Sequence, residues 1–230
     1  MMVFNYYIWP VMPELQKKSK GLAIARLEEM LNGYHPISGE LGKALLDHSR
    51  LIRVKRGELL VRQGEPCHHF YFILRGVLRS CIEDGSHEIT SWVTLEGQIV
   101  TSIHSLLEPT PCMESIQAVE NSLLVSLPLS ELERLCQRFP ELNIVVRKIL
   151  MIYYRDAEYR AVLARIPGAD RKYEFFLTHY PHLVSRIPLK IIASFLGIRY
   201  ETLSRIRSRI NANQQGVGVT SIPSDCSDSL

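Results

Sequence analysis

The chain has 230 residues, enough for one large domain or two ordinary ones with separate cores. Hydrophobic residues make up 46% of the sequence and charged residues 22%, which predicts a soluble globular protein and excludes a fibrous or wholly disordered one. The net charge of +3 is uneven: residues 165–210 carry nine basic and three acidic side chains, a local +6 that leaves −3 elsewhere. This distribution favours a polyanionic partner at one end of the chain.

Residues 1–20 are predicted to form an N-terminal extension. Their opening, MMVFNYYIWPVM, is apolar but short, it is interrupted by Asn5 and Pro10, and no basic residue precedes it. These features argue against a transmembrane helix and match a signal peptide poorly, so we expect no membrane partner. The five cysteines are widely spaced and never form C-x-x-C, which indicates reduced thiols, a cytoplasmic location and no metal site.

Residues 21–138 are predicted to form an effector-sensing domain. GLAIARLEEMLNG is typical of a short amphipathic helix, with Ile24, Leu27 and Leu31 on one face and Gly33 at its end. From about residue 51 to residue 127, short β-rich runs alternate with glycines, a pattern typical of an antiparallel sandwich or barrel. The segment PLSELERLCQRFP then predicts a short helix.

Residues 139–166 read as one long helix between Pro140 and Pro167. A spacing of about 3.5 residues selects a stripe that contains Leu142, Val145, Ile149, Ile152, Asp156, Tyr159, Leu163 and Ile166. We interpret this stripe as the seam of a parallel coiled coil, with the dimer interface formed by Val145, Ile149, Ile152, Asp156, Tyr159 and Leu163. The alternative is that the stripe packs on the helix's own domain. Asp156 would either fix the register of the seam or lie at its solvent edge.

Residues 167–212 read as a helix, a connection, a second helix, a turn and a third helix. In LKIIASFLGIRYETLSRIRS, Gly197 is suited to the bend, and apolar residues at spacings of three and four lie on both sides of it. This pattern predicts a helix-turn-helix. Residues 213–230 lack periodicity and are predicted to be a disordered tail.

The outer face of the last helix has the chemistry of a DNA-reading surface. Glu201 and Arg205 point away from the apolar positions, where an arginine can pair with guanine and a glutamate can accept from cytosine. The alternative is an ordinary i,i+4 ion pair between these two side chains on a solvated face. The expected DNA-binding residues are Lys190, Arg199, Tyr200, Glu201, Thr202, Ser204, Arg205, Arg207 and Arg209.

Over about residues 22–210 the chain resembles the Crp/Fnr family of transcription regulators. The resemblance rests on RGELLVRQGEPCHHFYFILRGVLRSCIEDG and on ASFLGIRYETLSRI, where Glu201, Thr202 and Arg205 match the family's recognition-helix pattern. It implies an α+β fold that contains a jelly-roll-like β-roll of the cyclic-nucleotide-binding type, a dimerisation helix and a C-terminal helix-turn-helix domain.

Family members that bind a cyclic nucleotide carry a Gly-Glu pair for the ribose and an Arg-Ser/Thr-Ala run for the phosphate. Here Gln98 follows Gly97, and Cys112, Met113 and Glu114 stand where the arginine run would be. Because no arginine clamps the phosphate and Glu114 repels it, we expect no bound cyclic AMP and no other cofactor. The pocket expected for an unknown small-molecule effector comprises Gly97, Gln98, Ile99, Cys112, Met113, Glu114 and Ser115.

These observations predict a homodimeric, sequence-specific transcription regulator that binds a pseudo-palindromic site in double-stranded DNA, with RNA polymerase as a candidate partner. The alternative is a small-ligand sensor that acts through protein contacts without DNA. No nucleophile-base constellation, phosphate loop or metal-ligand spacing is present in the sequence, so we expect no enzymatic activity and no catalytic residues.

Overall fold

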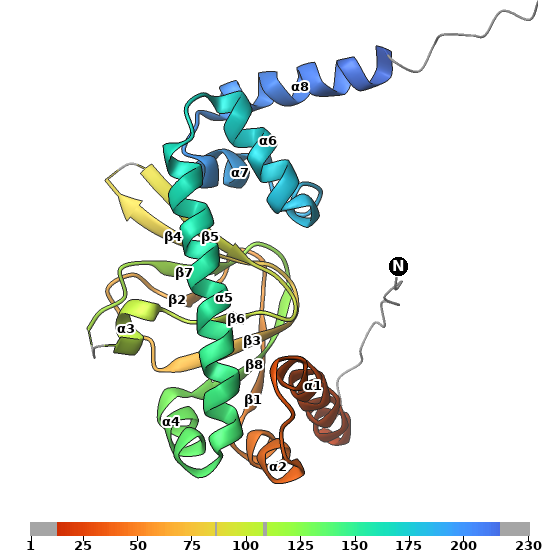
Figure 1. Cartoon of the computed structure of the whole chain (residues 1–230), viewed down its shortest axis with the longest axis vertical. Coiled ribbons are helices and arrows are strands. Elements are labelled where there is room, and N and C mark those ends of the chain that lie inside the picture. The colour runs from red at the N-terminus through yellow and green to blue at the C-terminus, as the bar shows by residue number, and fades with distance from the viewer. Residues whose placement is uncertain (1–12, 86, 108–109, 217–230) are drawn as a thin grey trace, which may run out of the picture. The chain divides into compact units, whose positions relative to one another are not determined.

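The structure, a computed structural model, describes residues 13–85, 87–107 and 110–216, and the side chains of 20–85, 87–105 and 110–212 (Figure 1). The chain divides into two units between Arg160 and Ala161.

Two helices precede the strands, α1 (Pro13–Tyr34) and α2 (Gly39–His48). The predicted first helix is present and begins at Pro13, within the stretch expected to be an extension; residues 1–12 lie outside the described chain. Helix α2 was not predicted. Its N-cap is Ser38, whose hydroxyl accepts a hydrogen bond from the backbone N–H of Leu41 at 3.2 Å.

The described residues contain eight strands, which form two four-stranded antiparallel sheets (Figure 1). Their order is β1-β8-β3-β6 in one sheet and β2-β7-β4-β5 in the other. The strands are β1 (Arg50–Val54), β2 (Leu59–Val61), β3 (His69–Arg75), β4 (Leu78–Asp84), β5 (His87–Thr94), β6 (Ile99–Val100), β7 (Ser115–Ala118) and β8 (Ser122–Pro128). A short helix, α3 (Ile103–Leu107), follows β6. The antiparallel β domain predicted from the alternating runs and glycines is confirmed.

Two hydrophobic clusters stabilise the first unit. One joins residues of both sheets, including Ile73, Leu78, Ile116 and Leu124, each of which is fully buried. The other joins helices to the outer side of the β1-β8-β3-β6 sheet through residues such as Phe72 and Val125. Burial of each such hydrophobic side chain contributes about 1.5–3 kcal/mol to stability, so both clusters are strongly stabilising.

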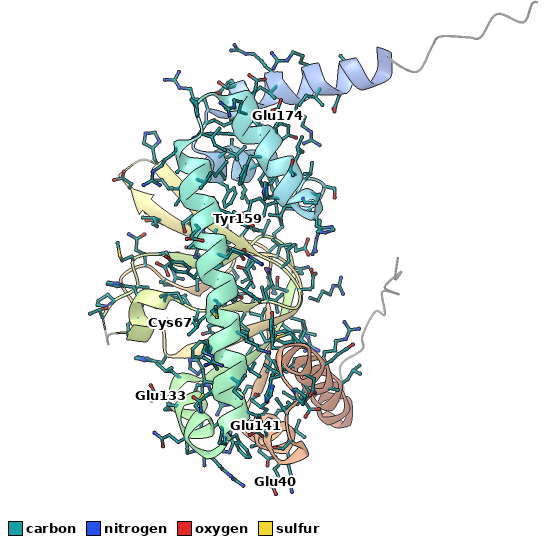
Figure 2. The ribbon with its side chains drawn as sticks, in the orientation of Figure 1. Glu40, Cys67, Glu133, Glu141, Tyr159 and Glu174 are labelled. Atoms are coloured by element: carbon teal, nitrogen blue, oxygen red, sulfur yellow. The ribbon has the colours of Figure 1, made fainter. Side chains whose placement is uncertain are left out.

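Helices α4 (Leu129–Arg138) and α5 (Pro140–Arg165) follow the roll, as the sequence predicts. Glu141 lies at the start of α5 and Tyr159 lies farther along it (Figure 2). Ser38 donates a hydrogen bond to Glu141 Oε1 at 2.8 Å, and this ties α5 to the N-cap of α2. The helix's own backbone N–H and then the Ser38 hydroxyl lower the pKa of Glu141.

Two positions of the predicted dimer seam pack within their own subunit. Val145 and Ile149 belong to the same hydrophobic cluster as α1 and β8, and Leu163 is also buried. Ile152 and Asp156 are half-buried on the same face, and Tyr159 is 38% exposed. The stripe faces its own domain because this side of α5 supplies the apolar surface that covers the sheet. At Val145 and Ile149 this burial favours the alternative, in which the stripe packs on its own domain, while the dimer interface itself stays a prediction.

The second unit contains α6 (Ala169–His179), the 3-10 turn η1 (Pro181–Leu183), α7 (Leu189–Leu196) and α8 (Tyr200–Gly216). This order agrees with the predicted helix, connection, helix, turn and helix. Helix α8 continues to Gly216, so residues 213–216, expected to belong to a disordered tail, are helical; residues 217–230 lie outside the described chain.

Candidate DNA-binding and effector sites

The turn between α7 and α8 is a tight left-handed cap. Gly197 has φ 62° and ψ 40°, a conformation that costs a residue with a Cβ about 1–2 kcal/mol. The N–H groups of Gly197 and Ile198 donate to the carbonyls of Ser194 and Ala193, both at 3.1 Å. These bonds satisfy the last carbonyls of α7 and fix the direction in which α8 begins.

The inner faces of α7 and α8 form the core of the second unit. Ile192 and Leu203 are fully buried, and Ile206 is nearly so. Helix α6 contributes Phe176, whose ring packs edge-on against Phe195 of α7 with centroids 5.9 Å apart. The Lys172 ammonium of α6 donates to the Leu196 carbonyl at 3.0 Å, so a positive charge caps the C-terminus of α7.

The outer face of α8 carries the predicted DNA-reading side chains. Lys190, Arg199, Tyr200, Glu201, Arg205 and Arg209 are exposed, whereas Thr202, Ser204 and Arg207 are half-buried. Both Glu201 and Arg205 are within the described residues, and no ion pair joins them. The i,i+4 pair considered from the sequence is therefore absent, and both groups are available to a ligand.

Arg209 has a partner that the sequence did not suggest. Its guanidinium forms an ion pair with Asp170, the acidic residue in the first turn of α6. Both side chains are more than half exposed, so the pair contributes little to stability. It nevertheless orients Arg209 toward α6, whereas Arg205 has no such restraint.

The structure gives the residues of the predicted effector pocket different environments. Cys112 and Ser115 are buried with the roll's interior, where Cys112 Sγ lies 3.1 Å from Ser105 Oγ. Met113 is 58% exposed and Glu114 is half-buried. Gly97, Gln98 and Ile99 line a pocket beside α5. The seven-residue effector pocket stays a prediction.

Within the described residues, the roll interior contains a cluster of thiol, phenol and aliphatic side chains. Cys67, Tyr71 and Cys112 occupy the same hydrophobic cluster, and burial raises the pKa of Tyr71 to about 12, with smaller contributions from the two thiols. The buried arginine of the roll, Arg79, bonds Glu88 at 2.6 Å and Gln117 through Nε at 2.9 Å. Its charge is therefore neutralised within the sheet.

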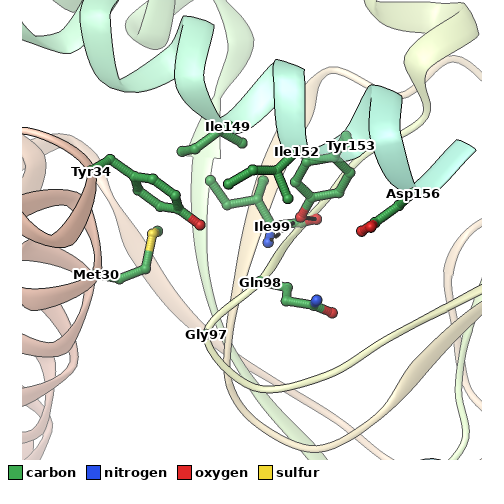
Figure 3. Close-up of a pocket in the computed structure, with 9 residues that line it drawn as sticks. All are labelled: Met30, Tyr34, Gly97, Gln98, Ile99, Ile149, Ile152, Tyr153 and Asp156. Carbon is green, nitrogen blue, oxygen red and sulfur yellow. Dashed lines mark hydrogen bonds between the residues drawn. The ribbon is translucent and has the colours of Figure 1, made fainter. Parts of the chain in front are cut away.

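A second pocket lies where α5 meets the Gly97 turn and α1 (Figure 3). Its enclosed space is about 30 Å³, enough for one or two water molecules. Its lining comprises Met30, Tyr34, Gly97, Gln98, Ile99, Ile149, Ile152, Tyr153 and Asp156. The Tyr153 hydroxyl accepts from the N–H of Ile99 at 2.8 Å and donates to the carbonyl of Ile99 at 2.5 Å. Burial raises the pKa of Tyr153 to about 12.

Sequence comparison identifies relatives of this chain. Residues 51–139 match the family described as the cyclic nucleotide-binding domain. The chain is 26% identical over 172 residues to the transcriptional activator protein FnrA of Stutzerimonas stutzeri, and the match covers 70% of each chain. It is 25% identical over 172 residues to the transcriptional activator protein anr of Pseudomonas aeruginosa, again over 70% of each chain.

Structural comparison agrees with these relatives. The structure of FixK2 from Bradyrhizobium japonicum matches with a TM-score of 0.64 at 17% identity, over 76% of this chain and 89% of that one. Together the comparisons confirm the α+β fold and the resemblance to Crp/Fnr-family regulators. The two relatives are named as transcriptional activators, which agrees with the expectation that the chain is not an enzyme. Within the described residues, no helix combines the length and apolar character needed to span a bilayer.

Proposed function

We propose that this relative of the Crp/Fnr regulators is a sequence-specific DNA-binding regulator of transcription that acts as a homodimer. The observation that carries the proposal is the outer face of α8, where Glu201 and Arg205 are exposed and unpaired on a helix held by a Gly197 turn. A rigid helix that presents free hydrogen-bonding groups is suited to the major groove.

Each side chain of this surface has an assigned role. Arg205 pairs with a guanine edge and Glu201 accepts from a cytosine amino group. Arg199, just before α8, and Lys190 of α7 neutralise phosphates, while Tyr200, Thr202, Ser204 and Arg207 flank the reading positions. Arg209 is assigned to phosphate contact after it exchanges Asp170 for the DNA backbone.

The dimer interface proposed here uses the side of α5 opposite to the predicted seam. Leu150, Met151 and Tyr154 are 51%, 67% and 69% exposed, and Val162, farther along the same side of α5, is 52% exposed. An exposed apolar stripe of this kind favours a second copy of the same helix. Two subunits joined in this way would place their α8 helices in successive major grooves, about 34 Å apart, on a pseudo-palindromic site.

We propose further that cyclic AMP is not the effector, because Arg79 is engaged by Glu88 and the residues in place of the phosphate-binding run include the exposed Met113. Titration calorimetry with cyclic AMP should give no heat of binding. A saturable signal at micromolar ligand would overturn this part of the proposal.

The experiment that tests DNA recognition is selection from random double-stranded DNA, followed by binding measurements on the enriched site. We expect an enriched pseudo-palindrome. Arg205→Ala should lose preference at one base pair per half-site, at a cost of about 1–3 kcal/mol, and should bind other sequences much as before. Arg53→Ala, an exposed arginine on β1, is the matched control and should leave the site unchanged.

Selection without any enriched sequence would contradict the proposal and favour a sensor that acts through protein contacts. If Arg205→Ala bound every DNA sequence more weakly by the same factor, Arg205 would contact only phosphate.

A further inference from the structure

We propose that the turn between β1 and β2 is a second DNA-binding surface, which contacts the phosphate backbone outside the bases read by α8. The turn comprises residues 55–58, and its basic side chains are Lys55 and Arg56. We call it the basic turn. It belongs to the first unit, whereas α8 belongs to the second. This inference rests on the proposed function, because it takes the same DNA as the partner.

The basic turn lies in a segment whose charge is opposite to that of most of the chain. Residues 50–62 contain five basic side chains and one acidic side chain, a local charge of +4. The chain outside residues 50–62 and 165–210 contains 13 basic and 20 acidic side chains, a net charge of −7. Positive charge is therefore concentrated in this segment as well as in the segment that contains the DNA-reading residues, and each favours a polyanionic partner.

The backbone of the basic turn is fixed by its own hydrogen bonds. The Glu58 N–H donates to the Lys55 carbonyl at 3.0 Å, and the Lys55 N–H donates to Glu58 Oε2 at 2.9 Å. Gly57 has φ 83°, which suits the third position of a type II turn and is readily available to glycine. The turn is therefore closed without the help of either basic side chain.

The end of β7 and the β7–β8 connection also hold the basic turn. The Arg56 N–H donates to Asn121 Oδ1 at 2.9 Å, and the Gly57 N–H donates to the Ala118 carbonyl at 2.8 Å. Gln117 Nε2 donates to the Gly57 carbonyl at 3.0 Å. Because the backbone is anchored on both sides, little conformational entropy remains to be lost when the turn meets a partner.

The charges of the basic turn are free to bind a ligand. Lys55 and Arg56 are exposed, and among the described residues neither side chain has an ion-pair partner. Glu58 is the acid of the turn, and its carboxylate accepts from the backbone N–H of Lys55. Arg62, just after β2, is also exposed and unpaired within the described chain. The structure thus presents cationic groups on a rigid support without neutralising them.

The composition of this surface favours nucleic acid over an acidic protein. Stable protein interfaces place aromatic or aliphatic anchors near their centre. Met151 and Tyr154 are exposed hydrophobic residues of this kind on α5, but residues 50–62, all of which are described, contain none. Arginine and lysine without such an anchor match the phosphate contacts that position a protein on duplex DNA.

The test compares two DNA duplexes in binding titrations with the full chain. One contains only the enriched site, and the other adds about 20 base pairs, two helical turns, on each side. We expect the longer duplex to bind the unmodified chain at least about tenfold more tightly. Its affinity should also depend more steeply on salt, by about 0.9 in the log–log slope for each additional phosphate that the turn neutralises.

The double variant Lys55→Gln, Arg56→Gln should bind the two duplexes with affinities that agree within about twofold, because it lacks the contacts outside the site. Its affinity for the short duplex should match that of the unmodified chain. The hydrogen bonds that hold the turn use the backbone of both residues, so both substitutions leave these bonds intact. Circular dichroism checks the fold.

Lys43→Gln is the matched control for the single variant Lys55→Gln. It removes an exposed lysine on α2 that has no ion-pair partner among the described residues. Lys43→Gln should keep the full preference for the longer duplex, whereas Lys55→Gln should lose part of it. The enriched site should be the same for all these variants, because phosphate contacts carry no sequence information.

Equal affinity of the unmodified chain for both duplexes, an undiminished preference in the double variant, or an equal loss in Lys43→Gln would overturn the inference. Unchanged DNA affinity of the double variant, together with lost activation of RNA polymerase in vitro, would assign the turn to an acidic protein instead. If selection enriched no sequence, the proposed function would fail. Weaker binding of the double variant to random long DNA would then still support the basic turn.

Discussion

Gly197 determines, at the scale of a single residue, how α8 is presented. Its φ of 62° is readily available to glycine and asparagine but strained for other residues. Gly197→Ala should therefore lower the free energy of unfolding of the second unit by about 1 kcal/mol, and Gly197→Asn by less. Thermal unfolding followed by circular dichroism measures both. Equal losses for the two variants would mean that the left-handed backbone is not the cause.

Sequence periodicity predicts the burial and the contacts of a residue only when its neighbours in the fold are also close in the sequence. The buried Leu203 and the exposed Arg205 follow from helical periodicity alone, and both were placed correctly. The partner of Arg209 could not be found in this way, because Asp170 lies 39 residues earlier, on another helix. The same limit applies to Arg79, whose buried pair with Glu88 depends on the register of β4 and β5.

At the scale of elements, the Tyr153 side chain joins α5 to β6. Tyr153→Phe removes a hydroxyl that bonds both backbone groups of Ile99, so it should destabilise the first unit by about 1–2 kcal/mol. Tyr154→Phe is the matched control, because this neighbour is 69% exposed and its substitution should change stability by less than about 0.5 kcal/mol. Urea unfolding of the two variants gives the comparison. If the two variants lost similar amounts of free energy of unfolding, the hydrogen bonds to Ile99 would contribute nothing to stability.

The same contact predicts a dependence on pH. Burial raises the pKa of Tyr153 to about 12 in the folded chain, against about 10 for an unfolded tyrosine. A raised folded pKa stabilises the protein below the unfolded pKa, and the contribution is lost as pH rises from about 10 to 12. The stability of Tyr153→Phe should therefore fall less steeply over this interval than that of the unmodified chain. The free energy of unfolding of both proteins is measured by urea titration at each pH. An equal fall for both proteins over this interval would refute the prediction.

The order of elements was predictable, but the partner of α5 was not. Alternating strands, glycines and helical periods indicated the roll, α4, α5 and the three C-terminal helices. A stripe that contains Val145 and Ile149 has the same spacing whether it faces its own sheet or a second subunit, so periodicity alone could not decide. Helix α2 was missed because Gly39 and Gly42 weaken its helical propensity, while Leu41 and Leu45 stabilise it through tertiary burial.

At the scale of the whole molecule, DNA recognition by the proposed dimer depends on the apolar side of α5. If Leu150, Met151 and Tyr154 form the subunit contact, a charge at its centre must be buried without a partner. Met151→Asp should therefore give monomers by light scattering. Its affinity for a two-half-site DNA should fall by at least about tenfold, because each subunit then binds alone.

Two further variants distinguish this interface from the alternatives. Ile89→Asp places the same charge on β5, at a residue that is 44% exposed, and it should leave the dimer intact. Ile152→Asp alters the inward face of α5, so it should lower the stability of the first unit more than Met151→Asp does. If Met151→Asp remained dimeric while Ile152→Asp became a folded monomer, the seam predicted from the heptad spacing would be restored, and the exposed stripe would need another partner.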